Sequence, residues 1–444
     1  MTGASLHGRS LVGRTTRRSR DLAAIAGLAL VLRTAWVLAY GRVVSGPNDT
    51  LFYMIASNGL AEGRGYSTLY GQPTAHWPPG FPFLVSLAYR LFGSHPAIAL
   101  ALNVALATAT AVLLYLVAER MFGRRGGLVA GSAFAVLPGP LFFTGLFLSE
   151  TTFIFVLVGF LALALLLPER RWTPLVLGIA LGAAALTRGE GLLMAVIPLA
   201  MWWGHLSRRE WLRHAAVLLA AMALTILPWT IRNAVVMDSF VPVATNASTT
   251  LWSGHNPAAD GGPTYAPPSL IKRVPGNLRS PAHEVAEARL LRREALHWAV
   301  HHPLEELELI PRKLLALSGS TSNVFGTWFN ARGDRQLGPT SERLFGAVGD
   351  SFSYLLLLAS LGSLVLVGVR RLWRIHRGMQ GILAYLALCL VAYGFVYYGQ
   401  YRYRMPMEPL MILVATPLVL RLGTRDGRPR PRGSRARGRL ERRG

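Results

Sequence analysis

Three acidic residues in the N-terminal half of the sequence lie directly beside long apolar runs: Asp49, Glu150 and Glu190. An ionised acid at mid-membrane costs about 2.5–3.5 kcal/mol on insertion scales, and less near the interface. Each acid therefore needs a partner or water, and an acid kept at such a position is a candidate site residue. Asp49 follows the first apolar run and precedes the rigid turn 76–82, whose prolines direct the chain back towards the membrane.

Arginines on the same predicted side of the membrane supply complementary charge. Arg188 lies two residues before Glu190 in a short turn, Arg232 follows an apolar run, and Arg402 and Arg404 alternate with tyrosines. A planar guanidinium binds phosphate through two hydrogen bonds, and a flat aromatic ring beside it offers a stacking surface. These arginines are candidates for binding an anionic headgroup. Snorkelling of the side chains at an aromatic belt is the competing interpretation.

Two of the acids also have purely structural interpretations. Ser149 is a possible N-cap, and Glu150 would then stabilise the start of the next helix through its dipole. Arg188 and Glu190 would neutralise each other between two short apolar runs. Neither interpretation excludes a role in a site.

Motifs for a metal or a nucleotide are missing from the sequence. His76 and the pair His301-His302 lack metal-ligand spacing with further His or Cys residues, so no metal site and no cofactor is predicted, and the need for a divalent cation stays open. A Gly-rich loop ending in Lys-Ser/Thr and a Gly-x-Ser-x-Gly elbow are both absent. The single cysteine, Cys389, excludes a disulfide framework.

The composition indicates a polytopic membrane protein. Of the 444 residues, 52% are hydrophobic and 15% are charged, whereas soluble domains carry about 25% charged residues. The net charge of +24 comes from arginines in short runs between apolar segments and in the C-terminal tail. This distribution follows the positive-inside rule and argues against a nucleic-acid partner, because the tail has no aromatic residues to stack on bases.

The apolar runs predict an all-α protein with about ten transmembrane helices. No small-residue cleavage pattern follows the first run, so we interpret it as an uncleaved helix with a cytoplasmic N-terminus. The expected spans are 21–40, 96–118, 127–144, 151–167, 173–187, 191–204, 212–230, 351–369, 379–398 and 406–421. The basic flanks place the candidate acids on the extracytoplasmic side of a multi-pass plasma-membrane protein.

The spans divide the chain into modules: a basic tail 1–20, an N-terminal transmembrane catalytic module 21–230 with a first outer loop 41–95, an outer segment 231–350, C-terminal transmembrane helices 351–421 and a basic tail 422–444. Within the first outer loop, 81–92 is short and apolar and is expected to form a juxtamembrane helix. The outer segment is expected to be mostly α-helical, with amphipathic patterns over 286–299 and 304–317.

The predicted arrangement suits one kind of reaction. A carboxylate acting as general base on a hydroxyl contributes roughly 10²–10⁴-fold to a rate. Arginines stabilise charge on a departing phosphate. The donor would be an amphiphilic phosphate-bearing molecule in the bilayer, and the hydroxyl acceptor would come from outside.

At this point the residues resemble a known family, the membrane glycosyltransferases of the GT-C superfamily. The specific branch is the bacterial one similar to protein O-mannosyltransferases and the lipid A aminoarabinose transferase. Six pieces in the family's order carry the resemblance: Asp49 with Tyr53 and Gly63-Arg64-Gly65-Tyr66; Pro78-Pro79-Gly80-Phe81-Pro82 with Tyr89-Arg90-Leu91-Phe92-Gly93; Leu148-Ser149-Glu150; Thr187-Arg188-Gly189-Glu190-Gly191; Pro228-Trp229-Thr230-Ile231-Arg232-Asn233; and Arg402-Tyr403-Arg404-Met405-Pro406.

The resemblance implies an inverting transferase that uses a polyprenyl-phosphate-linked sugar on the extracytoplasmic face. It implies that Asp49 is the catalytic base and that Glu150 is a second acid in the same cavity. The implied donor- or phosphate-binding residues are Arg188, Arg402, Arg404, Tyr53 and His76, with Glu190 and Arg232 in support. The sequence has Asn48-Asp49 where protein mannosyltransferases commonly carry two adjacent acids, so the acceptor stays open: glycan, lipid or protein.

Two other classes of function remain open on the sequence alone. A transporter or flippase for a lipid-linked sugar also needs charged groups that face a cavity. Such proteins usually show paired halves with broken helices, and the sequence shows no internal repeat. A receptor or scaffold that uses the outer segment would leave the acids at the membrane unexplained.

Overall fold

A computed structural model describes residues 4–41, 49–325 and 337–423 of the chain. These residues form helices and loops, and within them β structure is limited to one isolated bridge between Ser67 and Pro73. The prediction of an all-α protein is confirmed.

The helices in chain order are α1 (Ala4–Tyr40), α2 (Asp49–Ala61), α3 (Gly80–Phe92), α4 (Pro96–Val136), α5 (Pro138–Thr144), α6 (Glu150–Leu166), α7 (Thr173–Thr187), η1 (Gly189–Ala195), α8 (Val196–Trp202), α9 (Arg208–Val236), α10 (Asn246–Gly254), α11 (Pro268–Ile271), α12 (Pro281–His301), α13 (Pro303–Leu317), α14 (Pro339–Gly362), η4 (Ser363–Gly368), α15 (Val369–Ile375), α16 (Arg377–Phe395), α17 (Tyr401–Arg404), η5 (Met405–Met407) and α18 (Glu408–Leu422).

The hydropathy of these helices confirms a polytopic membrane protein. Within the described residues, six helical stretches are long and apolar enough to cross a bilayer: Thr16–Tyr40, Pro96–Val136, Arg208–Val236, Pro339–Ile375, Arg377–Phe395 and Tyr401–Leu422. Four shorter apolar stretches accompany them: Gly80–Phe92, Glu150–Leu166, Thr173–Thr187 and Gly189–Trp202. The total of about ten spans stays a prediction, because the shorter stretches need neighbours or a thin bilayer to cross.

Helix α4 contains the break that the sequence placed between two runs. Gly123 has φ 77° and ψ −179°, a conformation that interrupts the helix and that glycine adopts without strain. The next residue, Arg124, donates two hydrogen bonds to Asp21 of α1, at 2.6 and 2.8 Å. The run expected over 127–144 is itself divided at Leu137, because Pro138 starts the separate helix α5.

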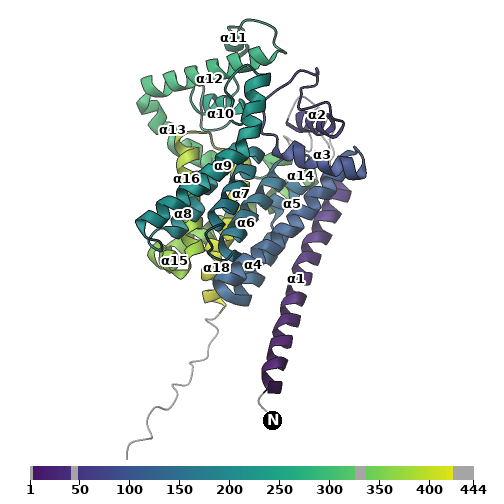
Figure 1. Cartoon of the computed structure of the whole chain (residues 1–444), viewed down its shortest axis with the longest axis vertical. Helices are drawn as coiled ribbons and strands as arrows, with labels where there is room; N and C mark the ends of the chain where they lie inside the picture. Colours follow the sequence, from purple (N-terminus) through teal and green to yellow (C-terminus); the bar gives the residue numbers. More distant parts are fainter. Residues whose placement is uncertain (1–3, 42–48, 326–336, 424–444) are drawn as a thin grey trace, which may run out of the picture.

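The helices sort the chain into two ends (Figure 1). Helices α10 to α13 and helix α2 lie at the upper end of the view, whereas the N-terminus of α1 lies at the lower end. The outer segment expected over 231–350 corresponds mainly to α10–α13, and its predicted limit at residue 350 falls inside α14. The first outer loop and the outer segment therefore lie at the same end of the bundle.

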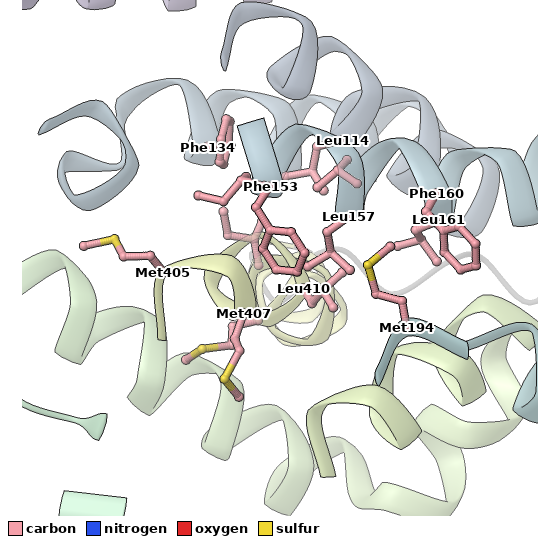
Figure 2. Close-up of a cluster of buried hydrophobic side chains, with 14 of the residues drawn as sticks. Leu114, Phe134, Phe153, Leu157, Phe160, Leu161, Met194, Met405, Met407 and Leu410 are labelled. Atoms are coloured by element: carbon pink, nitrogen blue, oxygen red, sulfur yellow. The ribbon is translucent and has the colours of Figure 1, made fainter. Parts of the chain in front are cut away.

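The buried core fixes the helices that carry the site. Figure 2 shows Phe153 and Leu157 of α6 beside Leu410 of α18, and all three side chains are buried. Helix α6 also packs against η5, which follows directly on α17, and this contact brings Arg402 to the start of α6, where Glu150 lies. Burial of such large apolar side chains is the main favourable contribution to this contact.

Small residues allow α7 and α9 to pack closely. A Cβ atom added at Gly178 would lie 2.5 Å from the Cβ of Ala221, and one added at Gly182 would lie 2.5 Å from the Cβ of Thr225. Close backbone approach at small residues is a common basis of helix association in membranes.

We therefore expect Gly178→Ala to lower the thermal unfolding midpoint in detergent, because overpacking of a tight contact costs about 1–3 kcal/mol. The control is Gly27→Ala, since a Cβ at Gly27 meets no atom within 4 Å. Equal midpoints for the two variants would contradict the tight α7–α9 contact.

Candidate active site

Five side chains form one connected group, which we call the carboxylate–arginine cluster: Asp49, Glu150, Arg188, Glu190 and Arg402. They come from the start of α2, the start of α6, the residue after α7, the start of η1 and α17. More than 350 residues separate the first and last members in the sequence. Packing of α7 and η5 against α6 brings the members together, so the cluster depends on the membrane bundle.

Glu150 lies at the centre of the cluster. Its side chain is 0% exposed, and its Oε1 accepts hydrogen bonds from Arg188 Nη1 at 2.8 Å and from Arg402 Nε. Its Oε2 is buried without a hydrogen-bond partner in the described part of the chain. A buried carboxylate needs cations and donors around it, and two guanidinium groups meet that need.

Asp49 is the most exposed acid of the cluster. Its Oδ2 lies 2.7 Å from Arg402 Nη1, and its side chain is 24% exposed, against 17% for Glu190. Asp49 is also the first residue of α2, where the helix dipole stabilises a negative charge. Of the three acids, Asp49 is therefore the one that a substrate reaches most easily.

Arg188 forms ion pairs with both Glu150 and Glu190. Besides Glu150, it binds Glu190 through two nitrogen–oxygen pairs, at 3.1 and 3.4 Å. Its guanidinium carbon lies 5.8 Å from the Phe153 ring and 6.0 Å from the Tyr403 ring. Arg188 and Glu190 therefore form the ion pair that the sequence predicted, and Arg188 also forms an ion pair with Glu150.

Ser149 and Tyr53 complete the wall beside the cluster. The Tyr53 hydroxyl lies 3.4 Å from Ser149 Oγ, which also accepts a hydrogen bond of 3.2 Å from Arg188. Burial and the nearby Asp49 charge raise the pKa of Tyr53, so its hydroxyl stays protonated. Ser149 occupies the N-cap position of α6 and Glu150 lies in the first turn, as expected, but the Ser149 side chain makes no capping hydrogen bond and its Oγ accepts from Arg188 instead.

Arg404 lies outside the cluster, although it is only two residues from Arg402. Its guanidinium binds Glu408 at 3.2 Å, the Gly319 carbonyl at 3.0 Å and Thr321 Oγ1 at 3.2 Å. These contacts hold the loop after α13 against α18. The structure therefore does not bring Arg404 to the position that the sequence predicted for a phosphate ligand.

His76 of the first outer loop and Arg232 of α9, which contacts that loop, lie outside the carboxylate–arginine cluster. Arg232 donates to the Thr74 carbonyl at 2.7 Å and to the Tyr66 carbonyl at 2.8 Å. The His76 ring packs edge-on against Trp77, with ring centroids 4.0 Å apart, and hydrogen-bonds to no residue described here. Both residues are placed to shape the loop that precedes α3.

Arg33 lies inside the first apolar run of the sequence, a position that predicts a place near the outer interface or a carboxylate partner. Arg33 is instead fully buried in α1, and it donates to the carbonyls of Ala135 at 2.9 Å and Phe134 at 3.1 Å. A carboxylate partner is wrong for Arg33, because the carbonyls at the end of α4 have no helical donors left and accept its hydrogen bonds.

No group of three or more His, Cys, Asp or Glu residues with metal-binding geometry occurs in the described ranges.

The contact of Ser149 with Arg188 was not predicted from the sequence. The signal was available, because Ser149 precedes Glu150 directly and is polar in an otherwise apolar stretch.

The fold and the cluster define a class, a membrane protein with an acid- and arginine-lined site at one end of its helices. Residues 76–231 match the family model described as dolichyl-phosphate-mannose-protein mannosyltransferase. This range contains Glu150, Arg188 and Glu190, whereas Asp49 and Arg402 lie outside it. No curated protein sequence matches the chain.

Solved structures with the same fold include the oligosaccharyltransferase of Archaeoglobus fulgidus. Its complex with zinc and sulfate is 16% identical, with a TM-score of 0.51, over 90% of this chain and 49% of the other. The AglB complex with an inhibitory peptide and a dolichol-phosphate is 16% identical, with a TM-score of 0.54, over 92% and 51%. The chain thus spans about half the length of these proteins.

A third structure, ArnT from Cupriavidus metallidurans bound to undecaprenyl phosphate, is 18% identical over 90% of this chain and 78% of that chain, with a TM-score of 0.43. The family model and the fold shared with AglB support the predicted resemblance to the membrane glycosyltransferases of the GT-C superfamily.

The environment of His76 predicts a pH effect on stability. Burial lowers the pKa of His76 below its ordinary value near 6.5, while the carboxylates of Glu284, Asp49 and Glu287 act in the opposite direction. Because the unfolded chain then binds the proton more readily, stability is unaffected above about pH 6.5 and falls as the pH drops below that value. We expect His76→Gln to lose less stability than the wild type between pH 7 and pH 5, measured by thermal unfolding in detergent. Parallel curves for the two proteins would contradict this account.

Proposed function

We propose that the protein is an inverting glycosyltransferase that moves a sugar from a polyprenyl-phosphate-linked donor to a hydroxyl acceptor. The observation that carries the proposal is Arg402, which bridges Asp49 and Glu150 while Arg188 binds the same oxygen of Glu150. The family description, which names a dolichyl-phosphate-linked mannose, supports a donor of this class. The acceptor is a cell-envelope glycan, lipid or protein.

The two arginines suit the donor phosphate because of their geometry and position. Their side chains are each 12% exposed and so lie mostly within the protein, whereas Asp49, which pairs with Arg402, is 24% exposed. Charge-assisted hydrogen bonds from guanidinium to phosphate are among the strongest in proteins, and partial burial strengthens them further. An apolar lipid tail is compatible with a site that adjoins membrane-spanning helices.

The charges of the cluster require that one carboxylate leaves its arginine partner when the donor phosphate binds. Three carboxylates face two guanidinium groups, so an added phosphate would increase an existing excess of negative charge. Asp49 makes one contact with Arg402 and is the most exposed of the acids, whereas Glu150 is fully buried. We infer that the phosphate displaces Asp49 from Arg402 and so frees its carboxylate to act as a base.

The proposed reaction is a single displacement. The acceptor hydroxyl gives its proton to Asp49, and its oxygen forms a bond to the anomeric carbon of the sugar. The bond from that carbon to the phosphate oxygen breaks, and the electron pair leaves with the lipid phosphate. Arg188 and Arg402 stabilise the negative charge that grows on the departing phosphate. Glu150 and Glu190 hold the two guanidinium groups in place.

We propose that this site faces the extracytoplasmic side of the plasma membrane. The opposite end of the bundle carries basic residues such as Arg124, beside Asp21, and Arg377, beside Glu169. Helix α9 also begins with basic residues at 208, 209 and 213. Positively charged flanks favour the cytoplasmic side.

Replacement of the proposed base is the direct test. We expect Asp49→Asn to lower sugar transfer by about 10²–10⁴-fold, because the amide cannot accept the acceptor's proton. The measurement supplies purified protein with a panel of polyprenyl-phosphate sugars and plausible acceptors, and mass spectrometry detects released polyprenyl phosphate.

The matched control is Glu62→Gln, which removes an exposed acid of the same loop that pairs with Arg64. It should keep full activity. Full activity of Asp49→Asn would overturn the assignment of the base. Intact donors with every acceptor, even for the wild type, would favour a transporter or flippase.

The proposed phosphate ligand has a different kinetic signature. We expect Arg188→Gln to raise the KM for the donor by about 10–100-fold, since a hydrogen bond to a charged group is worth about 1.5–3 kcal/mol. Arg188→Lys keeps the charge but not the two-pronged geometry, so its KM should lie between those of the wild type and Arg188→Gln. An unchanged KM in a folded Arg188→Gln protein would exclude Arg188 as a phosphate ligand.

A further inference from the structure

One acid of the outer segment binds the first outer loop, far from its own position in the sequence. Glu284 lies in the first turn of α12. Its carboxylate accepts hydrogen bonds from Thr74 Oγ1 at 2.6 Å, from the Ala75 backbone N–H at 3.1 Å and from Thr245 Oγ1 at 2.8 Å. Three donors on one carboxylate form a specific contact, and hydrogen bonds to a charged acceptor are stronger than neutral ones.

The same stretch of loop is held from other sides as well. The backbone N–H groups of Thr245 and Asn246 donate to the carbonyls of Ala75 and His76, at 2.9 and 3.1 Å. Arg232 of α9 donates to the Thr74 carbonyl at 2.7 Å. Residues 74–76 are therefore clamped between α12, the start of α10 and the end of α9.

The clamped loop continues directly into contacts with the helix that carries Asp49. Trp77 stacks on Phe52 of α2, with ring centroids 4.2 Å apart and an angle of 30° between the planes. The Tyr66 hydroxyl donates to the Trp77 carbonyl at 3.0 Å, and its ring packs against Phe52 at 5.6 Å. Phe52 lies less than one turn after Asp49, so its packing sets how the start of α2 is oriented.

We propose that Glu284 is a positioning residue for Asp49. The outer segment acts through Glu284, the loop 74–77 and the Trp77–Phe52 stack to fix the orientation of α2, and with it the carboxylate of Asp49. Glu284 itself touches none of the cluster residues in the contacts above. Its effect on transfer rests on the proposed function, whereas its effect on α2 does not.

The test combines amide hydrogen exchange with steady-state kinetics on the full-length protein in detergent. We expect Glu284→Ala to raise exchange over residues 50–61 by about tenfold, equivalent to about 1.4 kcal/mol. Exchange in α6 and α7 should stay unchanged, because Glu150 and Arg188 are held by other contacts. The kcat should fall while the KM for the donor stays constant.

Two further variants sharpen the comparison. Glu284→Gln keeps one acceptor oxygen and should lie between the wild type and Glu284→Ala in both measurements. Glu294→Gln is the control, because Glu294 lies on the same helix but pairs with Arg273 and Arg293 at the surface. It should change neither exchange over 50–61 nor kcat.

The outcomes separate the two proposals. Unchanged exchange over 50–61 in Glu284→Ala would overturn the positioning role, and so would a uniform rise across the whole chain. A localised rise in α2, in a protein whose wild type transfers no sugar, would support the coupling and contradict the proposed function.

Discussion

The burial of Glu150 between two arginines is the interaction on which the site depends. A carboxylate that is 0% exposed cannot stay ionised without compensating charge, and removal of one partner of such a pair costs several kcal/mol. Arg188 and Arg402 come from opposite parts of the sequence, so α7 and α17 must both reach the start of α6. Asp49 then enters the cluster through Arg402.

Four arginines were predicted from the sequence to bind an anionic headgroup, and in the fold they make different contacts. Arg188 and Arg402 bind the acids of the cluster, whereas Arg232 donates to carbonyls of the first outer loop and Arg404 binds Glu408 and carbonyls of the loop after α13. The second pair shapes the surroundings of the first. In the proposed transfer, rigid surroundings would favour catalysis, because arginines held in advance need not reorganise when charge develops on the leaving phosphate.

Much of the fold was predictable because apolar runs and acids beside them report directly on helices and membrane boundaries. The separate tasks of Arg402 and Arg404 were not, because residues two apart on a helical turn point in different directions. The sequence shows that Arg402 and Arg404 alternate with tyrosines, but it does not show which of the two arginines faces Glu150. Glu284 was also missed, since its contacts join residues about 210 positions apart and leave no local pattern.

The central claim is that a donor phosphate takes the place of Asp49 on Arg402. A structure of the full-length protein with polyprenyl phosphate bound tests it most directly. The account predicts phosphate oxygens within about 3 Å of the guanidinium nitrogens of both Arg188 and Arg402, with the Asp49 carboxylate detached from Arg402. A phosphate bound elsewhere, or an intact Asp49–Arg402 pair beside a bound phosphate, would contradict it.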